Sequence, residues 1–204
     1  LPHLRVLGVA RHRAKLRPLQ LQDTATRKLG ALVELRRDLV DRRTQALNQT
    51  TSLLKSYYPQ ALELVGNDLS TALALDFLTR WPDPLALKTA RPASLKSFYY
   101  RHSVRSAERV AQRLALVQTA RALTTDEAVL EPARLHLQAL VDQLRVFHKH
   151  IALLEKQIHS LFQNHGEAYL FRDLPGAGAA LKPRLLVAFG QDRTLYPDPA
   201  SFQK

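Results

Sequence analysis

Apolar residues recur in alternating steps of three and four along residues 131–164, with mostly polar residues between them. This mean period of 3.5 is typical of a helix whose apolar seam faces a partner in a coiled coil. The seam residues are Leu137, Leu140, Leu144, Phe147, Ile151, Leu154, Ile158 and Leu161. Such a helix would be roughly 50 Å long, longer than the core of a compact domain of this mass requires. A partner helix must therefore cover it, from this chain, from a second copy, or from both.

A second long helix is predicted for residues 23–58. Asp23 is a favoured N-cap residue, and Pro59 ends the helix because the residue before a proline avoids helical geometry. Two helices of similar length pack most economically as an antiparallel pair. The sequence therefore predicts an all-α fold of long antiparallel coiled-coil helices with a small helical head between them.

The head is predicted to consist of shorter helices, among them 93–101 and 103–123. Phe98, Tyr99 and Tyr100 are adjacent near the end of the first of these. Exposed aromatic rings can stack on nucleic-acid bases, but burial in the core of the head is the favoured interpretation.

The chain changes character after Gly166. A helical turn at 167–173 leads into Leu174-Pro175-Gly176-Ala177-Gly178, and a helix at 179–189 follows. This order predicts a helix-hairpin-helix element after the coiled coil. In such an element glycine allows the backbone to approach a phosphate, which the amides at the next helix N-terminus bind.

Four residues of this element are candidate phosphate contacts. Gly176 and Gly178 would offer backbone amides, and Lys182 and Arg184 would add positive charge. An ordinary tight turn explains the same glycine pattern equally well.

The net charge of +12 and the isoelectric point of about 10.4 favour polyanionic partners, either nucleic acid or an anionic membrane surface. The excess is concentrated in residues 1–58, which carry twelve Lys and Arg residues against four Asp and Glu residues. A generally soluble surface is the alternative interpretation of such a charge count.

A basic and polar ridge is predicted on the helix at 23–58. Its candidate nucleic-acid contacts are Arg36, Arg37, Arg42, Arg43 and Asn48. Asp38 and Asp41 lie three or four residues from several of these arginines, so salt bridges within the helix are the alternative.

The composition argues against several other sites. The chain has no cysteine, which removes disulfides and thiolate metal sites. His148 and His150 lie on different helix faces, so we expect no metal site and no cofactor in this chain. No run of about 18 apolar residues occurs, so no membrane span is predicted.

The ends of the chain suggest a fragment of a longer protein. The sequence begins with Leu1, contains no Met, and stops soon after Asp198-Pro199, a pair typical of a helix start.

Three stretches resemble the transposases of the insertion-sequence one-ten family. They are RHRAKLRPL, LRRDLVDRRTQALNQTTSLLKSYYPQAL and, most specifically, LPGAGAALKPRLLVAFGQDRTLYPDPASFQK. The resemblance covers essentially the whole chain. It implies a RuvC-like DEDD recombinase guided by a structured bridge RNA, with Mg²⁺ bound by four acidic residues of an N-terminal domain. It also implies a dimerising coiled coil and a C-terminal domain that supplies a serine nucleophile.

The resemblance divides the chain into three regions. Residues 1–22 would be the tail end of the RuvC-like domain or a linker, and residues 23–165 the helical coiled-coil dimerisation region. Residues 166–204 would start the C-terminal transposase domain. The catalytic acidic residues would lie upstream and the serine downstream, so the resemblance implies no catalytic residue here. Ser201 occupies a variable position and is not assigned as the nucleophile, and Lys182 stands where relatives more often have a small residue.

The resemblance thus implies DNA transposition and recombination, with this chain as a nucleic-acid-binding, dimerising scaffold. DNA, a structured guide RNA and further copies of the chain are the expected partners, and the bacterial cytoplasm and nucleoid the expected location. The alternative is a non-catalytic structural coiled-coil or adaptor protein with an incidental basic surface.

Overall fold

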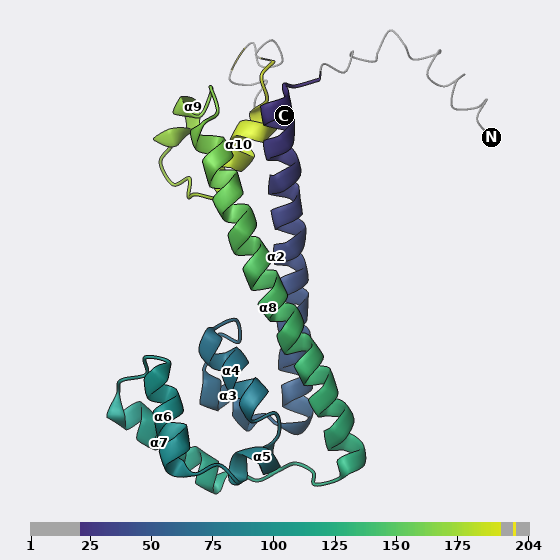
Figure 1. Ribbon diagram of the computed structural model, residues 1–204, viewed down its shortest axis with the longest axis vertical. Helices are drawn as coiled ribbons and strands as arrows, with labels where there is room; N and C mark the ends of the chain where they lie inside the picture. The colour runs from purple at the N-terminus through teal and green to yellow at the C-terminus, as the bar shows by residue number, and fades with distance from the viewer. Residues whose placement is uncertain (1–20, 193–197, 199–204) are drawn as a thin grey trace, which may run out of the picture. The chain divides into compact units, whose positions relative to one another are not determined.

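The computed structural model describes residues 21–192 and 198, and within them all regular secondary structure is helical (Figure 1). The predicted all-α fold is therefore confirmed. Its helices are α2 (Thr24–Tyr57), α3 (Gln60–Val65), α4 (Ala72–Arg80), α5 (Pro84–Lys88), α6 (Pro92–Arg101), α7 (Ala107–Thr119), α8 (Glu127–Gln163), α9 (Tyr169–Arg172) and α10 (Leu181–Phe189). The described residues form two compact units. One is Glu34–Gln157, and the other contains the described parts of Leu1–Val33 and Ile158–Lys204.

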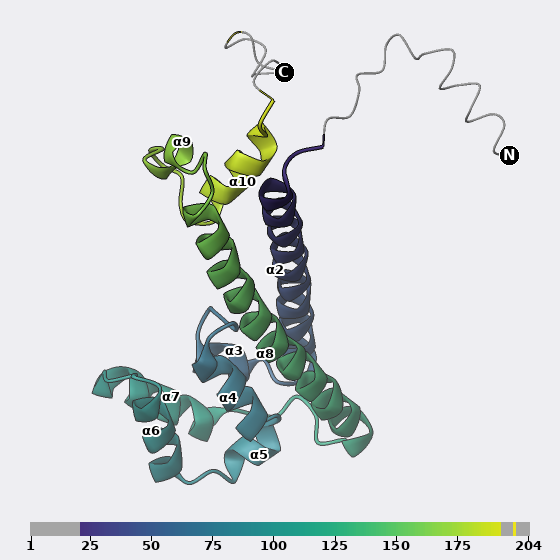
Figure 2. The ribbon, with the colours of Figure 1, turned by 45° about the horizontal axis from the view of Figure 1, so that its top comes forward.

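In the unit Glu34–Gln157, the two long helices α2 and α8 run side by side in opposite directions, as both ribbon views show (Figures 1 and 2). The predicted seam of α8 is buried along this pairing. Leu137 and Leu144 are completely buried, and Phe147 is half-buried. Burial of such a stripe supplies most of the stability of an amphipathic helix. The seam is thus covered within the chain, whereas interdigitation of the coiled-coil type remains a prediction.

The head, which comprises α3 to α7, packs around aromatic side chains. The rings of Phe77, Trp81 and Phe98 meet at centroid distances of 5.1 to 6.0 Å, and Tyr99 is completely buried beside them. The predicted burial of Phe98 and Tyr99 is therefore confirmed, but Tyr100 is exposed.

Polar contacts join the head to the long helices. The Tyr57 hydroxyl of α2 donates to the Pro82 carbonyl at 2.6 Å, and Arg134 of α8 donates to Asp83 at 3.1 Å. Asp83 also caps α5 by accepting from the Ala86 amide. Because the buried Asp83 carboxylate accepts hydrogen bonds both from the start of α5 and from Arg134, it fixes α5 against α8.

Local capping residues set where the helices around the head begin. Helix α8 begins at Glu127, four residues before the stretch that carries the seam, and Asp126 accepts a hydrogen bond from the Ala128 amide near the helix start. The predicted bounds of the helix at 103–123 are wrong. Helix α7 spans Ala107–Thr119 and not 103–123. Ser103 has a φ of +62°, which stops α6, and the Ser106 side chain caps the new helix.

In the second unit, the first turns of α2 lie against the C-terminal helices. Buried Thr26 and His165 share a hydrogen bond of 2.8 Å between Oγ1 and Nε2. A Cβ on Gly30 would lie 3.1 Å from Val187, so glycine permits a close approach of α10 there. The rings of Phe171 and Phe189 pack edge to face.

Candidate nucleic-acid interface

The structure places the predicted ridge arginines in different surroundings. Arg36 reaches across to α8, where its Nε and Nη2 donate to one Glu155 oxygen at 2.9 and 2.6 Å. Arg42 pairs with Asp38 one helical turn away, at 2.8 Å. Pairing satisfies both guanidinium groups and lowers the net positive charge available to a polyanion.

The remaining ridge residues differ in exposure. Arg37 is exposed, with its nearest carboxylate, that of Glu34, at 4.0 Å, and Asn48 is also exposed. Arg43 is half-buried, and its Nε is buried without a hydrogen-bond partner in the described part of the chain. Burial lowers the pKa of His148, and the nearby Arg43 guanidinium lowers it further. The five predicted residues therefore do not form one uniformly exposed cationic strip.

The glycine hairpin lies between α9 and α10. Gly176 has a φ of +74°, a conformation that side chains with a Cβ rarely adopt, so the turn itself explains this glycine. Gly178 has no such φ, and a Cβ built on it would meet nothing within 4 Å. Neither backbone conformation nor packing requires glycine at 178, which leaves the backbone there open to an external group.

The two basic residues of this element have different roles. Lys182 donates from Nζ to the carbonyl oxygen of Arg172, the last residue of α9. This contact places a positive charge at the C-terminal end of that helical turn. Arg184 is exposed.

Asp23 and Gln191 connect the start of α2 to the residues after α10. The Asp23 amide donates to Gln191 Oε1 at 3.1 Å, and Gln191 Nε2 donates to Asp23 Oδ2 at 2.8 Å. Asp23 also caps α2 by accepting from the Thr26 amide at 2.6 Å. Hydrogen bonds from Thr26, and then from Gln191, lower the pKa of Asp23 to about 2.

Sequence reasoning missed a concentration of exposed cations in the head. Arg101, Arg105 and Arg109 follow one another at four-residue intervals at the end of α6 and into α7, and all three are exposed. The regular spacing is visible in the sequence. It does not by itself indicate a binding surface, because a charged stripe on an amphipathic helix is usually only a solvated face.

The described residues contain no cluster of three or more His, Cys, Asp or Glu side chains that could hold a metal ion. None of the described helices is long and apolar enough to cross a membrane.

Comparison with known proteins identifies relatives of the chain. Residues 6–59 match the family model of the DEDD transposases of insertion sequence IS110, described as a transposase. The mini-circle putative transposase for IS117 of Streptomyces coelicolor is 27% identical over 191 residues, which cover 89% of this chain and 45% of that protein. The uncharacterized 42 kDa protein of insertion element IS900 of Mycobacterium paratuberculosis is also 27% identical, over 92% of this chain and 46% of the relative.

The chain thus spans about half the length of the curated relatives it matches. No solved structure matches it. The family match includes the whole of α2, and the two relatives extend the similarity over nearly the whole chain. By these matches, residues 6–59 are similar to the IS110 transposases, and nearly the whole chain is similar to a putative transposase and to an insertion-element protein.

Proposed function

We propose that this chain is the nucleic-acid-binding and self-associating scaffold of an insertion-sequence transposase, acting in DNA transposition on the bacterial nucleoid. Similarity to a putative transposase along 89% of the chain is the observation that carries the proposal. The resemblance to the transposases places strand cleavage and transfer, with any Mg²⁺ they need, on none of the residues of this chain, and we propose no catalytic role for them.

The glycine hairpin is the proposed phosphate contact of this scaffold. Backbone amides at the start of a helix attract anions, and the open space around Gly178 lets a phosphate come close. The phosphate would belong to DNA or to a structured guide RNA, with exposed Arg184 nearby in sequence adding charge.

A matched pair of glycine variants tests the hairpin. A Cβ at either Gly178 or Gly166 would meet no atom within 4 Å, so Gly178→Val and Gly166→Val should both fold. We expect Gly178→Val to weaken binding of a DNA duplex or an RNA hairpin about tenfold in fluorescence anisotropy, because the side chain blocks the backbone. Gly166→Val should bind like the parent chain. Equal affinities for the two variants would remove the hairpin from the interface.

Self-association is proposed to use an apolar groove between α2 and α8. The groove has a volume of about 410 Å³, and it is lined by Leu35, Leu39, Val146, Phe147, His150, Leu153, Leu154 and Gln157. Val146 and Leu153 are seven residues apart and about half exposed, which gives α8 a second apolar stripe besides its buried seam. A heptad-spaced stripe fits another helix of the same kind, so we propose a second copy of the chain as its occupant.

Sedimentation of Leu153→Glu tests this surface. A carboxylate in the groove should convert an oligomer at tens of micromolar protein into a monomer, because burying the charge against a second copy is unfavourable. Val129→Glu introduces the same charge at a comparably exposed position of α8 outside the groove, and it should leave the oligomer intact. A monomeric parent chain would contradict the proposal.

The second candidate function is a structural adaptor whose positive charge is incidental. The pairing of Arg36 with Glu155 and of Arg42 with Asp38 favours it, since these arginines have partners without any nucleic acid. An adaptor would not need Gly178, so the glycine pair above also distinguishes the two functions.

A further inference from the structure

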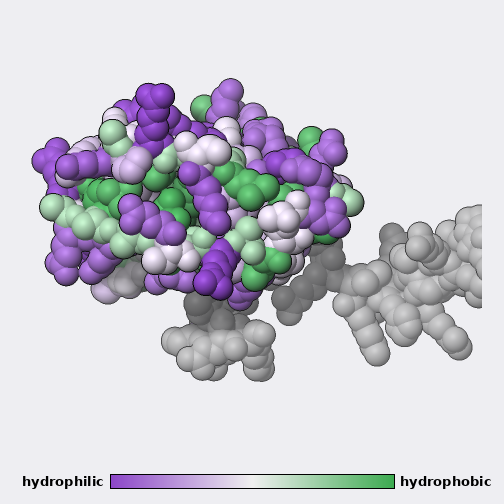
Figure 3. Space-filling view, turned by 90° about the horizontal axis from the view of Figure 1, so that it is seen from below, coloured by the Kyte–Doolittle hydropathy of each residue, from purple (hydrophilic) through white to green (hydrophobic). Residues whose placement is uncertain are grey.

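The strongest concentration of unpaired charge in the described residues lies in the head. Residues 91–121 contain seven Lys and Arg residues and a single acidic residue, Glu108. The seven are Arg91, Lys96, Arg101, Arg105, Arg109, Arg113 and Arg121. Among the ion pairs of the described residues, none involves any of these cations, whereas Arg36 and Arg42 of α2 are both paired. Seen from below, hydrophilic residues lie around the margins of this face and apolar residues form a band across its middle (Figure 3).

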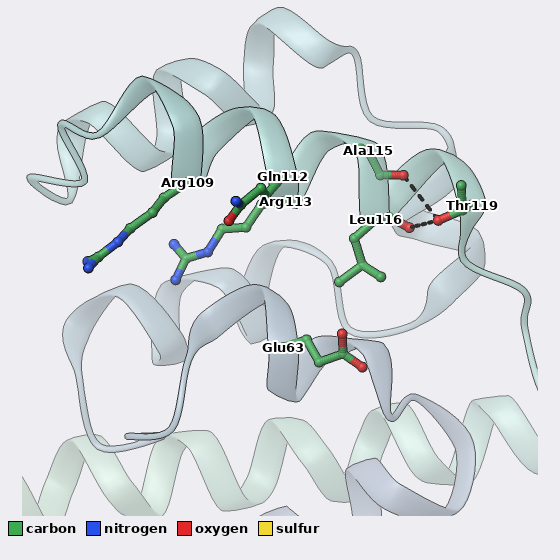
Figure 4. A pocket seen from close by; sticks show the side chains of 7 residues that line it. All are labelled: Glu63, Arg109, Gln112, Arg113, Ala115, Leu116 and Thr119. Atoms are coloured by element: carbon green, nitrogen blue, oxygen red, sulfur yellow. Dashed lines mark hydrogen bonds between the residues drawn. The ribbon is translucent and has the colours of Figure 1, made fainter.

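A groove of about 650 Å³ lies between α7 and α3 within this head (Figure 4). Arg109 and Arg113 project from α7 at one end of the groove, and Glu63 of α3 lies toward the other end, below Leu116. No ion pair joins Glu63 to either arginine among the described residues. The cationic end is therefore left available to an external anion.

Arg113 is fixed in position by an aromatic ring, but one of its hydrogen-bond donors has no partner among the described residues. Its guanidinium carbon lies 4.8 Å from the centroid of the Tyr99 ring, and Tyr99 is itself fixed by its hydroxyl, which donates to the Leu64 carbonyl. Nη1 of Arg113 is buried and has no hydrogen-bond partner in the described part of the chain. Arg113 also lines the groove, so its guanidinium group can meet a ligand there, and a phosphate oxygen is the acceptor that guanidinium groups bind best.

The neighbouring helix α6 carries an exposed ring beside two cations of its own. Tyr100 is 42% exposed, and the Lys96 ammonium lies 5.8 Å from its ring centroid. Arg101 follows directly in the sequence and is also exposed. An aromatic ring between cations is suited to a nucleotide base attached to its phosphate.

We propose that the α6–α7 face of the head is a second nucleic-acid-binding surface, on which Arg109 and Arg113 hold a backbone phosphate in the groove beside α3. Arg101 and Arg105 contact flanking phosphates, and Tyr100 stacks on an accessible base. The inference rests on the proposed function, in that the chain must bind nucleic acid, but it uses residues that are independent of the glycine hairpin.

Removal of exposed head cations tests the surface in the full chain. Arg101→Gln/Arg105→Gln/Arg109→Gln removes three exposed charges and should weaken binding of a DNA duplex about tenfold or more, with a shallower dependence on salt. The matched control Lys28→Gln/Lys149→Gln/Lys156→Gln removes three exposed charges elsewhere and should have less than about a threefold effect. Equal losses in the two triple variants would overturn the proposed surface.

An isosteric pair tests the groove itself. Gln112 lines the groove and Gln118 does not, although both are exposed on α7. Gln112→Glu offers the groove arginines an internal carboxylate, so it should compete with a phosphate and weaken binding about tenfold. Gln118→Glu brings the same charge change and should stay within about threefold of the parent chain. If the two variants bind alike while both keep the parent melting temperature, the groove holds no phosphate.

The same assay separates this inference from the proposed function. If the parent chain binds neither a DNA duplex nor an RNA hairpin of matching sequence, the proposed function fails and the inference with it. If the parent binds and Gly178→Val weakens binding while the head triple variant does not, only the inference fails. The DNA and RNA probes show which nucleic acid supplies the phosphate.

Discussion

At the residue scale, several side-chain contacts that connect the helices join positions far apart in the chain. Asp23 meets Gln191, and Arg36 meets Glu155, across more than 100 residues in each case. The sequence predicted Asp23 as a helix cap from local rules, and the structure confirms that role. The Gln191 and Glu155 partners were not predictable, because charge and helix periodicity say nothing about which side chain of another helix will lie opposite.

Acid should weaken the contact of Asp23 with Thr26 and Gln191. The pKa of this carboxylate is about 2 in the folded chain and near 3.8 otherwise, so its contribution is complete above about pH 4 and disappears as the pH falls through 2. The effect is small because the group is exposed. The melting temperature of the parent chain should fall slightly as the pH is lowered from 5 to 2, and the melting temperature of Asp23→Asn should lack this fall. An identical acid response in both proteins would assign the fall to other groups.

At the scale of the elements, periodicity was a reliable guide and boundaries were not. The seam of α8 is buried as predicted because a heptad pattern directly identifies one helix face. The bounds of α7 differ from the predicted 103–123 because Ser106 caps the helix and Ala120 ends it, which helix periodicity does not reveal. The glycine-containing turn lies between α9 and α10, and the helix-hairpin-helix element with its phosphate contact remains a prediction.

The two stripes of α8 should respond differently to truncation. Leu144 is completely buried, so Leu144→Ala should reduce the free energy of unfolding by about 2–5 kcal/mol through lost contacts and a cavity. Leu153 is 46% exposed, and Leu153→Ala should cost less than about 1 kcal/mol if measured at a concentration where the chain is monomeric. Urea denaturation measures both. A comparable cost for the two would mean that Leu153 belongs to the core of the chain and does not form an outer surface.

At the scale of the whole molecule, the net charge of +12 predicted a polyanionic partner without locating its surface. The sequence predicts the contact on α2, where the cations lie between the apolar positions of the helix. In the structure Arg36 and Arg42 are closely paired with carboxylates and Arg37 lies 4.0 Å from Glu34, whereas the Lys and Arg residues of α6 and α7 have no ion-pair partner among the described residues. Pairing depends on how helices pack, so a sequence count cannot separate neutralised charges from available ones.

The dependence of nucleic-acid binding on salt tests the central proposal most directly. Each phosphate contacted on a duplex contributes about −0.9 to the slope of log affinity against log salt concentration. With three or four phosphates bound by the hairpin and the head, the slope for the full chain and a DNA duplex should be about −3 between roughly 50 and 200 mM salt. A slope near zero, or no binding of DNA duplex or structured RNA even at the lowest salt, would contradict the account of this chain as a nucleic-acid-binding scaffold.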